Sequence, residues 1–244
     1  MPQTVWPKIR PELTEKQRAV MDDWYVQWLG EGLPDSFKPI DRFNHTYALR
    51  SASPGARTLE IGPGNGSHLL VENLAELEEY VALELRESLS EQIDTDHPNV
   101  RVVVGDCQRK LEFPDAHFDR VLAIHVLEHL DNLPAALREI KRVLKPSGLF
   151  SVVIPCEGGM GYALGRKFTS QRMFEKRYSM PYDWMIRYDH INQAREVLRE
   201  LRSDFRVVHR TFFPLRIPSV DANLIIGLTL KPASAVELPP ASDG

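Results

Sequence analysis

Three glycines alternate with other residues in the segment at positions 60–66, which reads EIGPGNG. Glycine has no side chain, so its backbone can adopt a positive φ and approach a ligand closely. A strand-like run precedes the loop, which places it at the carboxyl end of a strand, where open α/β sheets bind ligands. Glu84 ends the next strand-like run, 18 residues after Gly66, and a carboxylate there can accept hydrogen bonds from two ribose hydroxyls. Together the loop and Glu84 predict a site for a ribose-containing cofactor; taken separately, they would be a tight turn and a solvated strand end.

The spacing of the glycines distinguishes two cofactor classes. A dinucleotide fingerprint has the pattern GxGxxG or GxGxxA. Here Ser67 occupies the third position of that pattern, and the last glycine comes one residue earlier. The pattern present, an acid followed by three alternating glycines, argues against a nicotinamide dinucleotide. A NAD-dependent oxidoreductase remains the alternative from another class.

A second chemical candidate is the HxxEH group formed by His125, Glu128 and His129. His125 is the best single candidate for a general base, because the pKa of an imidazole lies near working pH. One group of zinc proteases has the same spacing, but such a site needs the motif within one helix and a further ligand. His125 falls at the end of a predicted strand, which disfavours a protease. In the plainer interpretation, Glu128 and His129 begin a helix and bond to neighbouring backbone.

Strands and helices alternate over residues 57–154, which predicts βαβ units and a parallel sheet covered on both faces. The predicted strands are 57–61, 80–85, 100–104, 118–124 and 149–154. The predicted helices are 67–79, 87–94 and 133–144, and Pro146 and Gly148 stop the last of them.

The flanks of this core add further elements. Two helices are predicted before it, at 12–30 with Gly30 as C-cap and at 41–52 with Asp41 as N-cap. After it we expect a helix at 190–202 capped by Asp189, and strands at 205–212 and 222–230. The organisation predicted is a helical segment (1–54), a core domain (55–231) with an insertion (156–189), and a tail (232–244) rich in Pro, Ser and Ala that we expect to be disordered.

The composition is that of a globular protein. The chain has 244 residues, of which 43% are hydrophobic and 26% charged, so one large domain with additions is expected. The net charge of −4 provides no global attraction to nucleic acid, which makes a nucleic-acid partner unfavoured. Two cysteines argue against a disulfide scaffold or a four-cysteine zinc site. No apolar leader or membrane span is evident, so the expected location is the cytoplasm; the oligomeric state is not predicted.

Residues 119–130 (DRVLAIHVLEHL) and 137–149 (LREIKRVLKPSGL) add two motifs in register with the glycine loop. With these three motifs the chain resembles the class I methyltransferases that use S-adenosylmethionine (SAM), well over residues 55–155 and in outline over 190–230. The resemblance implies a doubly wound, Rossmann-like α/β fold with a seven-stranded, mostly parallel sheet in the order 3-2-1-4-5-7-6, its last strand antiparallel. It implies methyl transfer from SAM to an oxygen or nitrogen of a small molecule.

The same resemblance implies which residues hold SAM. The three glycines would line its methionine and ribose side, Glu60 would shape the loop, and Glu84 would hold the ribose. Asp106 would accept a hydrogen bond from the adenine amino group, although it could also be a turn residue. Cys107 beside it would lie near the adenine, although it could be a small half-buried residue without chemistry. The full set predicted for the cofactor is Glu60, Gly62, Pro63, Gly64, Gly66, Glu84, Leu85, Asp106, Cys107, Ile124 and His125.

In this family the substrate is recognised by segments added to the SAM-binding core, and the insertion after Pro155 resembles such a segment. It is rich in arginines, which suit carboxylates or phosphates, and in aromatic residues, which suit sugar or ring faces. We therefore expect a small, polar or anionic, sugar-like acceptor, unless the segment is an ordinary solvated cover. The residues predicted to contact the acceptor are Tyr47, Tyr162, Arg166, Arg172, Tyr178, Arg187 and Tyr188, with His125 and His190 as catalytic residues; Tyr47 could equally pack in the core.

No metal is expected on the main interpretation. However, the HxxEH stretch is similar to the ExxEH of ubiquinone-pathway O-methyltransferases and of methyltransferases acting on the terminal ribose of small RNAs, which bind a divalent metal. In that alternative His125, Glu128 and His129, with His190, would coordinate a metal, and the acceptor would be a quinone, a lipid or an RNA terminus. The replacement of the first Glu by His125 weakens this alternative. A SAM-binding protein without catalysis is a further one.

Overall fold

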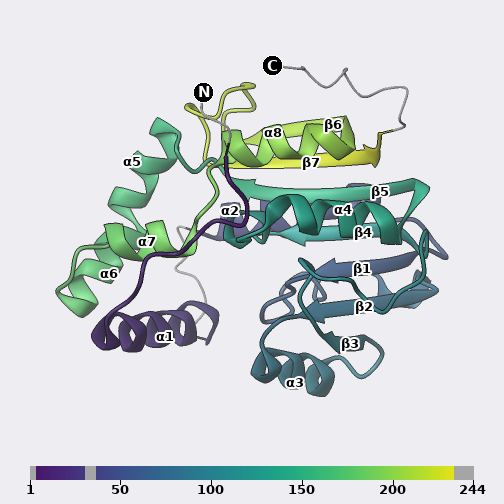
Figure 1. Cartoon of the computed structure of the whole chain (residues 1–244), viewed down its shortest axis with the longest axis horizontal. Coiled ribbons are helices and arrows are strands. Elements are labelled where there is room, and N and C mark those ends of the chain that lie inside the picture. Colours follow the sequence, from purple (N-terminus) through teal and green to yellow (C-terminus); the bar gives the residue numbers. More distant parts are fainter. Residues whose placement is uncertain (1–3, 31–36, 234–244) are drawn as a thin grey trace.

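A computed structural model describes residues 4–30 and 37–233 of the chain (Figure 1). Its centre is a seven-stranded sheet in the order β3-β2-β1-β4-β5-β7-β6, in which β7 is antiparallel to both of its neighbours and the other pairs are parallel. This arrangement confirms the predicted fold class and strand order. The strands are β1 (Arg57–Ile61), β2 (Glu79–Glu84), β3 (Arg101–Val104), β4 (Phe118–Ile124), β5 (Leu144–Pro155), β6 (Phe205–Phe213) and β7 (Ile225–Pro232).

Strand β4 lies in the middle of the sheet, and its central side chains are apolar on both faces. Val121 and Ala123 belong to the core under α4 (Leu133–Val143) and α8 (Ala194–Asp204). Leu122 and Ile124 pack on the other face with α2 (Lys38–Ala48). Because successive side chains of a strand point to opposite faces, a strand between two helical layers must be apolar throughout. Helix α3 (Glu87–Asp96) packs beside β2 and β3.

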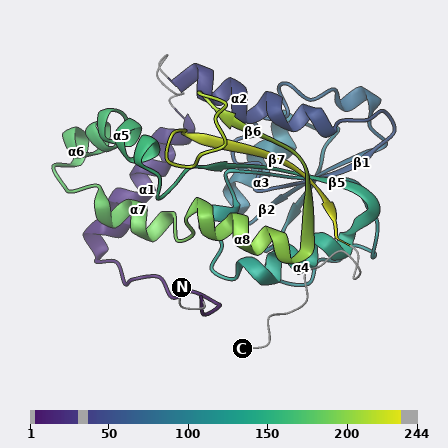
Figure 2. The same ribbon diagram turned by 90° about the horizontal axis from the view of Figure 1, so that it is seen from above.

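Four helices form a separate group beyond one end of the sheet, and we call them the cap helices (Figures 1 and 2). Three of them follow β5 in the chain, and the fourth comes from the N-terminal region. Trp24, Phe174 and Tyr182 pack together with their ring centroids 5.1 to 6.4 Å apart, which joins the N-terminal helix to the others. The cap helices are α1 (Glu15–Gly30), α5 (Met160–Phe168), α6 (Ser170–Tyr178) and α7 (Asp183–Asp189).

The helix predicted over residues 67–79 is wrong. The segment forms turns, followed by the 3-10 turn η3 (Leu74–Glu76). Its hydrogen bonds include i to i+3 contacts such as Leu69 N–H to the Gly66 carbonyl (2.9 Å). The cause is a contact with a distant strand: the side chain of Glu72, which is 2% exposed, accepts hydrogen bonds from Arg120 of β4 (2.7 Å) and from His68 (3.0 Å). Those contacts hold the segment against the sheet rather than letting it wind into a helix.

Several predicted boundaries also differ. Asp41 does not cap α2, which begins earlier, at Lys38, and continues into the 3-10 turn η2 (Leu49–Ser51). Asp189 ends α7 instead of capping the last helix, which begins at Ala194. Thr14 caps α1 by accepting from Gln17 N–H (3.2 Å), so this helix begins at Glu15 rather than at 12. The predicted tail lies outside the described residues from 234 onward. Among the described helices none is long and apolar enough to cross a membrane.

Candidate functional site

The glycine loop lies at the carboxyl end of β1, as predicted, and its three glycines adopt the backbone conformation that favours glycine. Their φ angles are +63° at Gly62, +61° at Gly64 and +77° at Gly66. A side chain at Gly62 would meet Val126 at 2.8 Å, whereas one at Gly64 would point into open space. The loop therefore presents backbone, free of side-chain atoms, at the position where a ligand would approach Gly64.

Glu84 lies beside this loop. Its carboxylate accepts from the N–H groups of Gly64 (3.3 Å), Leu85 (3.0 Å) and Arg86 (3.0 Å). These contacts hold the carboxylate, which is almost fully buried, at the mouth of the loop. The structure thus brings together the two features from which a cofactor site was predicted.

The remaining residues predicted for the cofactor have different surroundings. Glu60 accepts from the Tyr80 hydroxyl (2.7 Å), and its burial raises the pKa of the carboxyl. Asp106 caps a turn by accepting from Gln108 N–H (2.9 Å), and burial raises the pKa of the Cys107 thiol to about 12. Leu85 is exposed, whereas Pro63 and Ile124 are buried. Cofactor contacts by these residues stay predictions.

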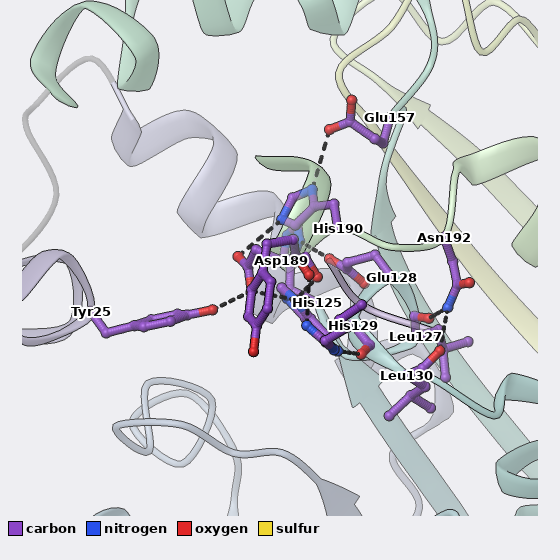
Figure 3. A network of polar contacts seen from close by, with 12 residues as sticks. Tyr25, His125, Leu127, Glu128, His129, Leu130, Glu157, Asp189, His190 and Asn192 are labelled. Atoms are coloured by element: carbon purple, nitrogen blue, oxygen red, sulfur yellow. Dashed lines mark hydrogen bonds and ion pairs between the residues drawn. The ribbon is translucent and has the colours of Figure 1, made fainter. Parts of the chain in front are cut away.

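The chain leaves β4 at His125, which adopts a φ of +54°. Its N–H still donates to the Val153 carbonyl of β5 (2.9 Å), but the left-handed conformation turns the chain into η4 (Leu127–His129). That turn brings Glu128 back beside His125, with 3.1 Å between Nδ1 of the histidine and Oε1 of the carboxylate. Asn192 holds the turn in place, because its buried amide donates to the carbonyls of Leu127 (2.9 Å) and Leu130 (2.7 Å) (Figure 3).

Glu128 is buried and surrounded by imidazoles. Burial alone would raise its pKa, but the hydrogen bond with His125 and the nearby His129 and His190 outweigh burial and lower it. An ionised Glu128 only accepts hydrogen bonds, so Nδ1 of His125 donates in this contact, and in the neutral imidazole Nε2 is then the nitrogen that can accept a proton. That Nε2 atom and Oε2 of Glu128 are buried and have no hydrogen-bond partner among the described residues.

Two further histidines complete the group, each held by a carboxylate (Figure 3). His129 Nδ1 lies 3.0 Å from Asp189 Oδ1, and His190 Nδ1 lies 3.2 Å from Glu157 Oε2. Burial would lower the pKa of His129, but the charge of Asp189 and its hydrogen bond raise it to about 9. One possible ligand atom from each of Glu128, His129 and His190 lies within 4.8 Å of the other two. This trio differs from the predicted metal set, because His125 is not part of it.

The N-terminal region supports this group from outside, which the sequence did not reveal. Arg10 donates to the Tyr188 carbonyl (2.7 Å) and to Asp131 Oδ1 (2.7 Å), and also bonds the carbonyl of His129. Tyr25 of α1 donates to Asp189, and burial raises the pKa of its hydroxyl, which therefore stays protonated. Glu157, Asp189 and Tyr25 were not predicted as site residues, because their partners are distant in the sequence. Glu157 lies 33 residues from His190, Asp189 lies 60 residues from His129, and Tyr25 lies 164 residues from Asp189.

The predicted acceptor residues divide into two sets. Arg166 lies near the site, bonded to Glu157 (2.9 Å) with its guanidinium 5.9 Å from the Tyr162 ring, and Tyr188 lies under Arg10 (5.1 Å). Tyr47 of α2 packs against one face of the sheet, and its hydroxyl lies 3.0 Å from His209 Nδ1. This position fits the core-packing alternative. Tyr178 bonds Asp23 of α1 (2.6 Å), and Arg172 and Arg187 are exposed on α6 and α7.

Comparisons with known proteins agree with this geometry. Residues 59–152 match the family of methyltransferase domains. A ubiquinone biosynthesis O-methyltransferase of Maricaulis maris is 31% identical over 163 residues, 59% of this chain and 61% of that protein. The first curated relatives are matched over 15% to 61% of their own length, so the chain spans less than two thirds of each.

Solved structures share the fold at low identity. The N-methyltransferase NodS of Bradyrhizobium japonicum, in complex with S-adenosylhomocysteine (SAH), is 13% identical and has a TM-score of 0.60, with 88% of this chain and 99% of that chain covered. The [4+2]-cyclase SpnF is 17% identical and has a TM-score of 0.63, with 92% and 98% covered. The chain thus has the fold that these solved structures share, and residues 59–152 match a methyltransferase domain. The cofactor that the domain and its structural neighbours indicate is SAM.

Proposed function

We propose that the protein transfers the methyl group of SAM to a hydroxyl oxygen of a small molecule, with His125 as the general base. The observation that carries the proposal is the pair formed by Glu128 and His125, which leaves Nε2 of the histidine buried and without a partner. A base that is held by a carboxylate at one nitrogen, with no partner among the described residues at the other, is the arrangement that proton abstraction from a hydroxyl needs.

The residues around the glycine loop fit the cofactor. Open space at Gly64 and the carboxylate of Glu84 beside it suit close approach of a ribose, and the exposed Leu85 suits an apolar contact with a purine ring. When bound, SAM supplies an electrophilic methyl group that a nucleophile can displace in line from sulfur. The chain contributes by orientation, which can account for much of the acceleration of such a displacement.

His125 would act on the acceptor itself. His125 follows the carboxyl end of β4, and the glycine loop follows the carboxyl end of the neighbouring parallel strand β1. An acceptor hydroxyl at this end of the sheet would therefore lie near both the base and the bound cofactor. As the new bond to oxygen forms, Nε2 accepts the hydroxyl proton, and the carboxylate of Glu128 stabilises the imidazolium that results. A nitrogen acceptor remains possible chemically, but an amine that is already unprotonated does not need this base.

For the acceptor we propose a small hydroxylated molecule whose polar part lies among Glu128, His129, Glu157 and His190. A sugar-like or a quinol-like head group has the hydroxyls to use these groups, and the ubiquinone biosynthesis relative acts, by its name, in a pathway of the second kind. Arg166 is already paired with Glu157, so an anionic acceptor would have to compete for it.

The first experiment is calorimetric titration of the purified protein with SAH, with NAD as a parallel control. Saturable binding of SAH and none of NAD supports the proposal, and a Gly64→Arg variant should lose that binding because its side chain fills the open space. Binding of NAD alone would refute the cofactor assignment. Binding of neither, once carried-over cofactor has been removed, would favour a protein that does not turn over.

A second candidate is the same transfer assisted by a divalent metal, which the trio of Glu128, His129 and His190 favours. Each histidine of the trio is held at Nδ1 by Asp189 or Glu157, as metal-ligating histidines commonly are. Such a metal would orient two neighbouring hydroxyls of the acceptor. Titration of the protein with Mg²⁺, Mn²⁺ and Zn²⁺ tests this directly: binding that is lost in Glu128→Gln supports it, and the absence of binding removes it.

A further inference from the structure

Helix α5 carries a stripe of large apolar side chains that face solvent. Met160, Leu164 and Phe168 follow one another at four-residue spacing, which places them on one side of a helix. Their exposed fractions are 75%, 59% and 67%. The other side of the helix is used for packing, since Tyr162 joins the core and Arg166 bonds Glu157. Contiguous exposed apolar surface of this kind marks an interaction site.

Basic residues are frequent in the helix that carries the stripe and in the next helix, α6. Residues 160–178 contain five Lys or Arg and one Glu, although the whole chain has a net charge of −4. Lys167, Arg172 and Lys176 are exposed. An apolar stripe beside exposed cations is the pattern of helices that lie in the interface of an anionic bilayer.

The position of α5 in the fold supports the same conclusion. The helix lies at the outer end of the molecule, away from the sheet (Figures 1 and 2). The loop between β6 and β7 packs on it, with Gly161 N–H donating to the Asp221 carbonyl (2.7 Å). That loop adds two exposed apolar side chains, Leu215 and Ile217, on either side of Arg216.

The inner side of α5 borders the candidate acceptor site. Arg166 bonds Glu157, and Glu157 in turn bonds His190 at 3.2 Å. A surface seated on the outer side of α5 would therefore lie one helix diameter, about 10 Å, from the acceptor site.

We propose that α5 and α6 dock on the surface of an anionic lipid bilayer. Met160, Leu164 and Phe168 enter the boundary between head groups and acyl chains, and Lys167, Arg172 and Lys176 meet the head groups. An amphiphilic acceptor then reaches the site from the bilayer, a conclusion that rests on the proposed methyl transfer, whereas the docking itself does not. A second copy of the chain is a poorer occupant, because two such faces repel each other and three side chains bury far less than the roughly 800 Å² per partner of a stable dimer.

The test is co-sedimentation of the whole protein with vesicles of phosphatidylcholine alone and of phosphatidylcholine mixed with phosphatidylglycerol. We expect binding to the anionic vesicles that weakens as salt is added. The double variant Leu164→Glu/Phe168→Glu should bind at least tenfold more weakly, and Lys167→Gln or Lys176→Gln about fivefold more weakly each. Leu70→Glu is the matched control, since this leucine is equally exposed but lies in the turns after the glycine loop, and it should leave vesicle binding unchanged.

Folding and cofactor binding are followed separately, by circular dichroism and by SAH titration of each variant. Wild-type protein that ignores anionic vesicles at low salt, or a double variant that binds as tightly as the wild type, overturns the proposal. A dimer in size-exclusion chromatography that the double variant abolishes assigns the face to a second copy and also overturns it. Protein that binds vesicles but not SAH retains the docking surface while the proposed methyl transfer fails.

Discussion

In the part of the chain that the structure describes, two groups of ionisable side chains each surround a buried carboxylate, Glu72 or Glu128, and their polar atoms are paired to different degrees. In the first, beside the turns that follow the glycine loop, each nitrogen of the Arg120 guanidinium has a partner: Glu72 at 2.7 Å, the Ala48 carbonyl at 2.8 Å and the Ser51 hydroxyl at 2.9 Å. Nδ1 of His68, whose Nε2 bonds Glu72, is the atom of this group without a partner among the described residues. In the second, at the end of β4, Nε2 of His125 and Oε2 of Glu128 have none among the described residues.

The difference separates support from chemistry. A buried polar atom without a partner costs about 1–3 kcal/mol, so the second group is less stable than it would be with a ligand in place. The first group has nothing to offer a ligand through its guanidinium, and its contacts join β4 to η2 and to the turns after the glycine loop. We therefore expect changes in the first group to alter stability, and changes in the second to alter turnover.

The largest expected effect is that of His125→Asn on turnover. Asparagine tolerates the left-handed conformation at this position but cannot act as a base, so we expect kcat to fall by about 10²–10⁴-fold. The affinity for SAH and the free energy of unfolding should stay near those of the wild type. Steady-state kinetics with calorimetry checks this, and an unchanged kcat would remove His125 as the base.

Arg120→Met tests the first group. The variant leaves the buried Glu72 without its cation, and breaking a buried ion pair in this way lowers the free energy of unfolding by about 3–5 kcal/mol. Urea denaturation measures the loss. Glu72→Gln/Arg120→Met is the control, since removing both charges should restore part of the stability; a loss as large as that of the single variant would contradict the ion-pair argument.

The sequence predicts the features that depend on residues close together in the chain, and misses those that depend on contacts between distant residues. The glycine loop, Glu84 and the strands follow local patterns, and each was predicted within a few residues of its place. The segment 67–79 was not, because its need to neutralise Arg120 comes from a strand 48 residues beyond Glu72. The contacts of His129 with Asp189, and of Asp189 with Tyr25, likewise join residues that only the tertiary fold brings together.

His45 lies within electrostatic range of both groups, and its burial makes the free energy of unfolding depend on pH. Burial lowers its pKa to about 4, with Asp41 opposing the shift and His68 and His125 adding to it. The unfolded chain, with an ordinary histidine pKa near 6.5, binds the proton more tightly, so this residue favours folding above that pH and the contribution disappears as pH falls from about 6.5 to 4. We expect up to about 3 kcal/mol to be lost over this range. His45→Gln should flatten the dependence of the unfolding free energy on pH there, and an equal slope in both proteins would show that other groups cause it.

The smallest effect, and the sharpest comparison, comes from two buried asparagines with the same kind of contact. Asn192 donates to the Leu127 and Leu130 carbonyls beside the second group, whereas Asn223 donates to the Ile217 (2.8 Å) and Ser219 (3.0 Å) carbonyls in the β6–β7 loop. Asn192→Ala removes the donor of the Leu127 and Leu130 carbonyls, whereas Asn223→Ala removes the donor of the Ser219 carbonyl and the acceptor of Leu215 N–H (2.8 Å), and Ile217 still accepts from Ser219 N–H (2.7 Å). Each variant should therefore lose about 1–3 kcal/mol of stability. Only Asn192→Ala should also lower kcat, by less than His125→Asn does, because the turn that aims Glu128 at His125 loosens. Equal kcat values in the two variants, measured where both are fully folded, would show that Asn192 supports the fold without positioning the base.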